Sequence, residues 1–485
     1  MNRPVRRVAV VLFGLALALL VRVTWLQAGE SHSLAVNPHN ERDAIDRYSR
    51  PLGDILVEGR PVTGSERTSG DLAYKRTYTD GKLYAPVTGY SSQLYGSTQL
   101  EALDQPLLDG TDPRLKSPLQ EFGRTPARPG EVLTTIDPAV QKAAYRGLGA
   151  STGAAVALDP RTGAILAMAS TPSYDPGTFS GESPADVRAR QALLADPRTP
   201  TLNRALRDPL APGSVFKLVV AAAALKDGLY PDVDTPTQSP DPYLPPRTTR
   251  YVTNEESSAP CRNASIRTAL QYSCNTVFAK IAVQLGSARI AAEADRLGFN
   301  DPDVDTPVRA AESVYPSRMN AAQTALSGFG QFDDQATPLE MAMVVSAVAD
   351  GGTLMKPYMV EETTDASGHA LSKADPGPYG GSPAMSAATA GELCSAMRTV
   401  VEDGTGTNAR IGGLTVGGKT GTAQNGDGNN GEPYAWFVSC ARGPRGKEVA
   451  VAVLVQSSGA VRTDVSGNGQ AAPIAAAMMR AALFG

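Results

Sequence analysis

The chain has 485 residues, of which 42% are hydrophobic and 19% charged, so it is long enough for two or three domains and has a globular composition. A formal net charge of -4 and the lack of a long Lys/Arg run in the sequence argue against nucleic acid as a partner. The four cysteines lack the spacing and the neighbouring histidines of a zinc site, so we predict neither a metal nor a cofactor.

The N-terminus carries a candidate membrane anchor. Three arginines among the first seven residues precede an apolar stretch from Val8 to Leu26, whose helical length of about 28 Å approaches the thickness of a hydrocarbon core. A cleaved signal peptide has a similar pattern, but Arg22 lies deep in the stretch and Leu26-Gln27-Ala28 lacks a small residue at its first position. We therefore expect an uncleaved, single-pass plasma-membrane anchor over residues 1–28, with the rest of the chain extracytoplasmic.

Two further regions follow the anchor. Short segments punctuated by Pro and Gly occupy residues 29 to about 130, which is typical of an irregular module with strands. A polar, Pro-rich stretch from Ser117 to Gly130 closes that module. We expect one domain at 29–137 and a larger one at 138–485.

The larger region alternates between strand and helix patterns. A hairpin is predicted at each end and a helical layer in the middle, which indicates an α+β domain with an antiparallel sheet covered by helices. The expected helices are 138–147, 215–225, 276–285 and 472–483, and the expected strands are 154–158, 164–169, 435–441 and 449–456.

A nucleophile is predicted in Pro212-Gly213-Ser214-Val215-Phe216-Lys217. Ser214 and Lys217 are three residues apart at the start of a helix, so their side chains project from one face. A buried lysine near other cations can be neutral enough to take the serine proton, and the helix start directs backbone amides at an oxyanion. One or two such pairs arise by chance in a chain of this length, so the motif needs support.

Ser273-Cys274-Asn275 supplies a second element. A hydroxyl beside a lysine can relay a proton, and an amide side chain can hold a substrate amide. By itself this triplet would be an ordinary helix cap. A similar triplet at Ser466-Gly467-Asn468 lies in a Gly-rich loop near the chain end, and we interpret it as structural.

Lys419-Thr420-Gly421-Thr422 is the third element. At a strand edge it would offer a cation and hydroxyls to a carboxylate, and Gly421 would let a substrate approach the main chain. Three such elements in this order are a far stronger signal than any one alone.

With these motifs the chain resembles the class B penicillin-binding proteins over nearly its whole length, and among them the penicillin-binding protein A branch of actinobacteria. The resemblance extends to Asn203-Arg204-Ala205, to 328–331, 337–342 and 469–473, to Arg50 with 53–55, Gly89-Tyr90 with Leu100-Glu101, and to 134–137 with Gln141. It implies a penicilloyl-serine transferase fold, a strand-containing pedestal domain of the dimerisation type and one transmembrane helix. Val215 and Cys274 depart from residues common in the family, which affects only fine specificity.

The resemblance also implies an activity: a peptidoglycan D,D-transpeptidase that crosslinks stem peptides through an acyl-enzyme and is inhibited by β-lactams. It implies Ser214 as nucleophile, Lys217 as base, Ser273 as proton shuttle, Asn275 as a peptide ligand, and Lys419, Thr420, Gly421 and Thr422 as the substrate-binding strand, with the amides of Ser214 and Thr422 as oxyanion hole. The region before the larger domain is too short for a glycosyltransferase, so a separate one is implied as partner, together with division or elongation proteins.

The chain also contains residues that match the motifs of other protein classes. Gly413 to Thr420 fits a phosphate-binding loop, but no helix can follow it, and Gly149 to Gly153 fits a nucleophile elbow, but it leads from helix to strand. The histidines His32, His39 and His369 all lie in polar surroundings, which weakens a Ser-His-Asp reading, and Asn425 to Glu432 lacks the spacing of a calcium loop.

The same residues are compatible with further alternatives. A β-lactam sensor, or a penicillin-binding scaffold without turnover, would share the motifs. Cys261 and Cys274 either form a disulfide or are small buried residues.

Overall fold

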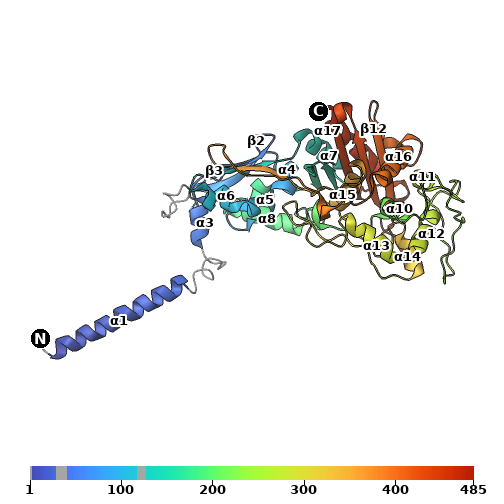
Figure 1. The fold of residues 1–485 in the computed structure, drawn as a ribbon. Coiled ribbons are helices and arrows are strands. Elements are labelled where there is room, and N and C mark those ends of the chain that lie inside the picture. Colours follow the sequence, from blue (N-terminus) through green and yellow to red (C-terminus); the bar gives the residue numbers. More distant parts are fainter. Residues whose placement is uncertain (1–2, 29–40, 71, 117–126) are drawn as a thin grey trace.

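The computed structural model describes residues 3–28, 41–70, 72–116 and 127–485 (Figure 1). Helix α1 (Arg3–Ala28) contains a 23-residue apolar stretch, Arg3–Trp25, which has a mean hydropathy of 2.3 and no buried residue. In the described part of the chain it is the one helix long and apolar enough to cross a membrane. Helix α1 therefore has the length and composition that the sequence predicted for a membrane anchor.

A five-stranded antiparallel sheet forms the centre of the larger domain, in the order β12-β13-β14-β8-β9. Its residues alternate between two cores: Trp436 and Leu454 lie on one face, while Phe437 and Val453 lie on the other. Because both faces are buried, the strands read as continuous apolar runs. The strands are β8 (Thr152–Leu158), β9 (Ile165–Thr171), β12 (Thr415–Ala423), β13 (Tyr434–Arg442) and β14 (Glu448–Ser457), which confirms both predicted hairpins.

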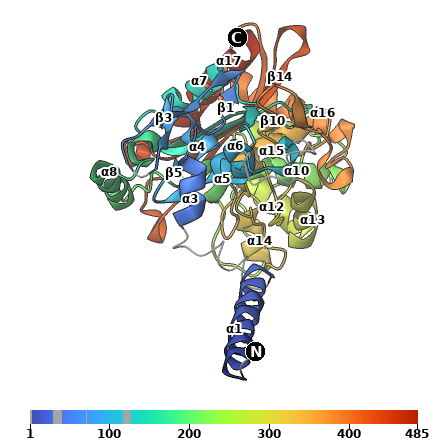
Figure 2. The ribbon, with the colours of Figure 1, turned by 90° about the vertical axis from the view of Figure 1, so that its left-hand side faces the viewer.

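Helices cover both faces of this sheet. On one face lie α7 (Pro138–Leu148) and α17 (Ala472–Phe484), which Figures 1 and 2 show side by side. On the other face lies the predicted helical layer, with the almost wholly buried α10 (Lys217–Lys226) within it. Its other members are α11 (Ile266–Gln271), α12 (Asn275–Leu285), α13 (Ser287–Arg296), α14 (Ala321–Ser327), α15 (Pro338–Ala349) and α16 (Ala387–Asp403). The α+β expectation is confirmed.

The N-terminal domain is built around a second sheet, in the order β11-β10-β7-β1-β2. β1 (Ile55–Val57) pairs in parallel with β7 (Glu131–Thr134), and β2 is Arg60–Pro61. The other two strands, β10 (Val360–Thr364) and β11 (Ala370–Lys373), come from the C-terminal part of the chain. A division of the chain at residue 137 therefore cuts through a shared sheet. Residues 117–126 of the predicted linker lie outside the described residues.

Smaller elements complete the N-terminal domain and its contact with the larger one. They are α3 (Glu41–Tyr48), β3 (Thr63–Arg67), β4 (Tyr74–Tyr78), α4 (Gly81–Thr88), β5 (Ser91–Ser92), β6 (Gly96–Ser97), α5 (Gln99–Leu103), α6 (Gln105–Asp109), α8 (Pro184–Ala195) and α9 (Arg204–Arg207).

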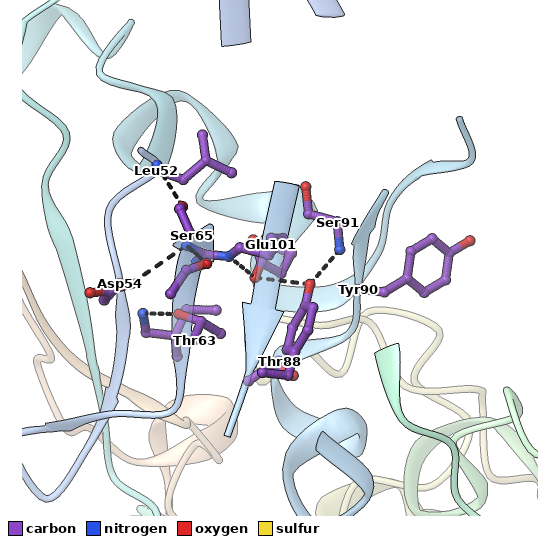
Figure 3. A network of polar contacts seen from close by, with 12 residues as sticks. Leu52, Asp54, Thr63, Ser65, Thr88, Tyr90, Ser91 and Glu101 are labelled. Carbon is purple, nitrogen blue, oxygen red and sulfur yellow. Dashed lines mark hydrogen bonds and ion pairs between the residues drawn. The ribbon is translucent and has the colours of Figure 1, made fainter. Parts of the chain in front are cut away.

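A buried polar network joins β4, β5 and α5 to Asp54, the residue that precedes β1 (Figure 3). The Nε atom of Arg76, a residue with no exposed surface, donates to Glu101 Oε1 at 2.6 Å. The Tyr78 hydroxyl donates to the same oxygen at 3.2 Å and accepts from the Ser91 amide at 2.6 Å. Asp54 faces Arg76 at 3.6 Å. Because removing one partner of such a network would leave a buried charge uncompensated, these residues must act as a unit.

Candidate functional site

Ser214 lies in a short 3-10 turn, Gly213–Phe216, that leads into α10. Gly213 has a φ of +56° and donates its amide to the Gly330 carbonyl at 2.9 Å. Gly330 has a φ of +73°, and a Cβ atom there would lie 2.0 Å from the Gly213 carbonyl oxygen. Two glycines are therefore needed to bring the backbones of residues 213 and 330 together. Ser214 faces a cleft of about 460 Å³.

Lys217, one turn further on, is fully buried and joins the first two motifs. Its Nζ donates to the Ser273 carbonyl at 2.7 Å, to Asn275 Oδ1 at 2.8 Å and to Ser273 Oγ at 3.2 Å. Ser273 has a φ of +58°, an unusual conformation for a residue other than glycine. That conformation presents both its carbonyl and its hydroxyl to Lys217.

Lys419 reaches the same hydroxyl from the sheet. It lies on β12, which is an edge strand as predicted for this motif. Its Nζ donates to Ser273 Oγ at 3.0 Å and to the Thr420 carbonyl at 2.8 Å. The Ser273 hydroxyl therefore lies between the Nζ atoms of two lysines, and all three predicted motifs meet at one point.

Burial dominates the electrostatics of both lysines. Desolvation, followed by the charge of Lys419, holds the pKa of Lys217 well below its ordinary value. Desolvation lowers the pKa of Lys419 to about 7, and the carboxylate of Glu255 acts against the shift in both lysines. Near neutral pH a lysine at this site can therefore be uncharged, which a proton acceptor requires.

The rest of the third motif divides between the cleft and the core. Thr422 lines the cleft with Ser214 and Asn275. The Thr420 side chain is buried, and its hydroxyl lies 2.7 Å from the Thr405 hydroxyl. A Cβ atom on Gly421 would lie 3.1 Å from the Pro212 carbonyl oxygen, so glycine here lets the segment before Ser214 pack on β12. We expected that glycine to admit substrate, and the structure adds this packing role.

Several cleft residues were not singled out from the sequence. Glu255 and Asn254 come from an irregular loop, and Phe332, with a φ of +80°, follows Gln331. A signal existed for Gln331, since residues 328–331 resemble a family segment. Glu255 had none, because an acidic residue in a polar loop looks like ordinary surface.

The disulfide between Cys261 and Cys274 is present, with Cα atoms 5.6 Å apart. It fastens the loop before α11 to the residue that follows Ser273, so the bridge supports the unusual conformation of that serine. Of the two open interpretations of these cysteines, the bridge is confirmed.

The competing motifs lie in the contexts expected of them. Residues 413–420 run into strand β12, and residues 149–153 form the turn after α7 and the first two residues of β8. His369 is exposed and contacts Asp365 at 3.1 Å, while His32 and His39 lie outside the described residues. Ser466 caps the turn before α17 through the Gly469 amide. In the stretch 425–432, Glu432 accepts hydrogen bonds from Ser457 and Ser458.

Comparisons with known proteins consistently find penicillin-binding proteins. Residues 153–480 match the family described as the penicillin binding protein transpeptidase domain, and residues 52–120 match the penicillin binding protein A dimerisation domain. The chain is 37% identical over 496 residues to the peptidoglycan D,D-transpeptidase PbpA of Mycolicibacterium smegmatis, covering 100% of this chain and 99% of that protein. Its identity to PbpA of Mycobacterium tuberculosis is 35% over 500 residues, covering 100% of both.

Solved structures agree. The chain is similar to penicillin-binding protein A from M. tuberculosis in a ceftriaxone acyl-enzyme complex, with a TM-score of 0.84 and 33% identity over 90% of this chain and 100% of that one. For the penicillin G acyl-enzyme complex the TM-score is 0.81 and the identity 34%, over 89% of this chain and 99% of that one.

Proposed function

Because the chain belongs to the penicillin-binding protein transpeptidase family and is similar over its whole length to peptidoglycan D,D-transpeptidases named PbpA, we propose that its acyl-enzyme forms on Ser214. It crosslinks the stem peptides of peptidoglycan, and β-lactams acylate it as they acylate its relatives. The observation that carries the residue assignment is the position of the Ser273 hydroxyl between Lys217 and Lys419, beside the cleft that Ser214 lines.

In the proposed acylation step, neutral Lys217 removes the proton from Ser214 as its oxygen attacks the peptide carbonyl. The two side chains project from one turn, and the lowered pKa of Lys217 makes the amine available as a base. The amides of Ser214 and Thr422 would hold the oxyanion, because the start of α10 and the edge of β12 meet at this point.

The leaving amine then needs a proton. Ser273 is the proposed shuttle, since its hydroxyl contacts Lys217 at 3.2 Å and Lys419 at 3.0 Å and can pass a proton from either lysine. In the second half of the reaction the same path runs in reverse, as an acceptor amine attacks the acyl-enzyme.

The remaining side chains bind substrate. Lys419 and Thr422 would bind the terminal carboxylate through charge-assisted hydrogen bonds, with Thr420 supporting the strand from the core side. Asn275 Oδ1 accepts a hydrogen bond from Lys217, and its Nδ2 donates to the Thr253 carbonyl at 3.3 Å. We propose that a substrate carbonyl replaces Thr253 as the acceptor.

The experiment is acylation by labelled penicillin. Wild-type protein should be labelled on the peptide that contains Ser214, and Ser214→Ala should show no labelling. Circular dichroism and thermal melting check that the variant is folded, because a hydroxyl facing a cleft contributes little to packing. Labelling of folded Ser214→Ala, or of another peptide in the wild type, would contradict the assignment.

The cellular arrangement is also a proposal. We propose that α1 anchors the chain with its arginine-bearing end in the cytoplasm, that the domains 29–137 and 138–485 face outward, and that a separate glycosyltransferase of the division or elongation machinery supplies the glycan strands. Reporter fusions placed before Arg3 and after Gly485 test the orientation, which is wrong if the N-terminal reporter proves external.

A further inference from the structure

A second cluster of reactive groups lies on the sheet away from Ser214. Cys394 on α16 and Cys440 on β13 are the two free cysteines of the described residues. Both line a cavity of about 320 Å³, together with Arg398, Arg442 and Glu448. The acyl-enzyme mechanism uses none of these groups.

The main chain of β12 brings the two cysteines close to one another. Gly417 pairs with Cys440 in the sheet, and a Cβ atom on Gly417 would lie 3.6 Å from both Cys440 Sγ and the Cys394 carbonyl oxygen. Both cysteines line the same cavity, and each thiol shifts the pKa of the other. Cys394 is partly exposed to the cavity, while Cys440 is buried behind it.

The surroundings make Cys394 the nucleophile of the pair. The hydrogen bond from Cys440, with the charges of Arg398 and Arg442, lowers the pKa of Cys394 to about 6. The same contact raises the pKa of Cys440 well above its usual value. A partly exposed cysteine with a low pKa next to a second cysteine is the pattern of a reactive cysteine with its resolving partner.

A metal explains this cluster less well. No group of three or more His, Cys, Asp or Glu side chains arranged to hold a metal ion occurs among the described residues. Glu448 is moreover engaged by Arg442 through an ion pair. Because Glu448 neutralises Arg442, the charge of Arg398 leaves the cavity positive, which favours a ligand that carries a carboxylate.

We propose that Cys394 and Cys440 form a dithiol modification site that reacts with small, carboxylate-bearing disulfides. The Cys394 thiolate attacks one sulfur of the disulfide, whose S–S bond breaks and releases one thiol. Cys440 then loses its proton and attacks the Cys394 sulfur of the mixed disulfide, which expels the second thiol. Two protein thiols are oxidised to one bridge, and the reagent is reduced to two thiols.

The second step is favoured by the first. The largest cause of the raised pKa of Cys440 is its contact with the Cys394 thiolate. The negative charge of that thiolate disappears once Cys394 is in a mixed disulfide. The product would tie α16 to β13 across the beginning of β12, the strand that carries Lys419. That such oxidants meet this face in the cell rests on the outward orientation proposed above, whereas the chemistry itself does not.

The test uses the full chain in detergent with oxidised glutathione at pH 7, followed by alkylation and peptide mass mapping without reduction. We expect near-complete conversion to a linked Cys394–Cys440 peptide pair. Cys440→Ala should stop at a glutathione adduct on Cys394, and Cys394→Ala should leave Cys440 unmodified. The Cys261–Cys274 bridge, already oxidised, serves as an internal control because its peptides should not change.

Two results would overturn the proposal: wild-type protein in which both thiols remain free, or one that keeps a glutathione adduct without forming the bridge. Both are read in the wild type, so the test does not depend on the variants folding. Penicillin labelling of the same samples reports on Ser214 separately. A bridge without labelling would contradict the proposed function alone, and labelling without a bridge would contradict this inference alone.

Discussion

At the scale of single residues, the site depends on how far two lysines are removed from water. Lys217 and Lys419 have no exposed surface, and their ammonium groups share the Ser273 hydroxyl. Burying two cations together is unfavourable, and the chain tolerates this because one of them can lose its proton. The same property suits Lys217 to the role of base proposed above.

The pH dependence of acylation follows from this arrangement. Acylation should rise with pH as Lys217 loses its proton, and fall again as Lys419 loses the charge that binds a carboxylate. Glu255 raises the pKa of both lysines, so Glu255→Gln should move both limbs of the profile to lower pH. The measurement is the second-order rate of penicillin acylation against pH. Glu256→Gln is the matched control, because Glu256 is hydrogen-bonded to Ser258. Equal profiles for Glu255→Gln and the wild type would refute the electrostatic role.

Carboxylate binding is tested at Thr422. Thr422→Val removes a hydroxyl that lines the cleft and keeps the shape of the side chain. Loss of one charge-assisted hydrogen bond is worth roughly 1.5 to 3 kcal/mol, so the acylation rate constant should fall about ten- to a hundredfold. The variant should also discriminate less against a ligand whose carboxylate is amidated. The Thr420 hydroxyl contacts Thr405, so Thr420→Val should lower the acylation rate constant less than Thr422→Val does. A larger decrease for Thr420→Val would contradict the assignment.

At the scale of elements, the position of Ser214 depends on segments far from it in the chain. The Trp436 indole donates to the Ala211 carbonyl at 3.0 Å, and residues 210 and 336 exchange backbone hydrogen bonds. Together with the contact between Gly213 and Gly330, these bonds hold the turn against β12 and β13. The turn is therefore positioned by the sheet and by residues 330–336.

Gly330→Ala tests that positioning. The new Cβ atom would meet the Gly213 carbonyl oxygen at 2.0 Å in a backbone with φ +73°, so the Ser214 turn must shift. We expect a loss of about 1–3 kcal/mol of stability, together with a lower acylation rate. Gly351→Ala is the control, because Gly351 has a φ of +61° with nothing within 4 Å of an added Cβ atom. Thermal melting and penicillin labelling are measured for both, and equal effects of the two variants would show that the close contact is unimportant.

At the scale of the whole molecule, the two domains are interlocked. Strands β10 and β11 complete the N-terminal sheet, the Gln141 amide donates to the Leu83 carbonyl at 2.9 Å, and Asn203 reaches the Pro86 carbonyl at 2.9 Å. Phe179 packs against Tyr90 at 5.1 Å between ring centroids. The large domain therefore shares several buried contacts with the N-terminal domain.

Truncation measures this dependence. A chain of residues 138–485 would lose β7, the partner of β10, and would expose the buried surface of Phe179 and Ile165. We expect it to be poorly soluble and to label weakly with penicillin, whereas residues 41–485 should be soluble and label fully. Full labelling and an unchanged melting temperature for 138–485 would show that the domain is independent.

The resemblance of its three motifs indicated the family, and the sequence by itself predicted the fold class, four strands of the sheet and four of the helices that cover it. These follow from local information: apolar runs of strand length, helical periodicity, turn residues, and the spacing of Ser214 and Lys217 on one turn. The Cys261–Cys274 bridge lay between two readings, because proximity along the chain only permits a bridge.

Tertiary structure alone decided the rest. Lys419 meets Ser273 across 146 residues, Gly330 meets Gly213, and β10 joins the sheet of a domain that precedes it by more than two hundred residues. Glu255 affects the pKa of Lys217 only because the fold brings the two residues near each other, and Cys440 affects the pKa of Cys394 for the same reason. Such contacts cannot be predicted from local sequence patterns. The pattern of an element indicates that it is buried, but which distant element it contacts depends on how the whole chain packs.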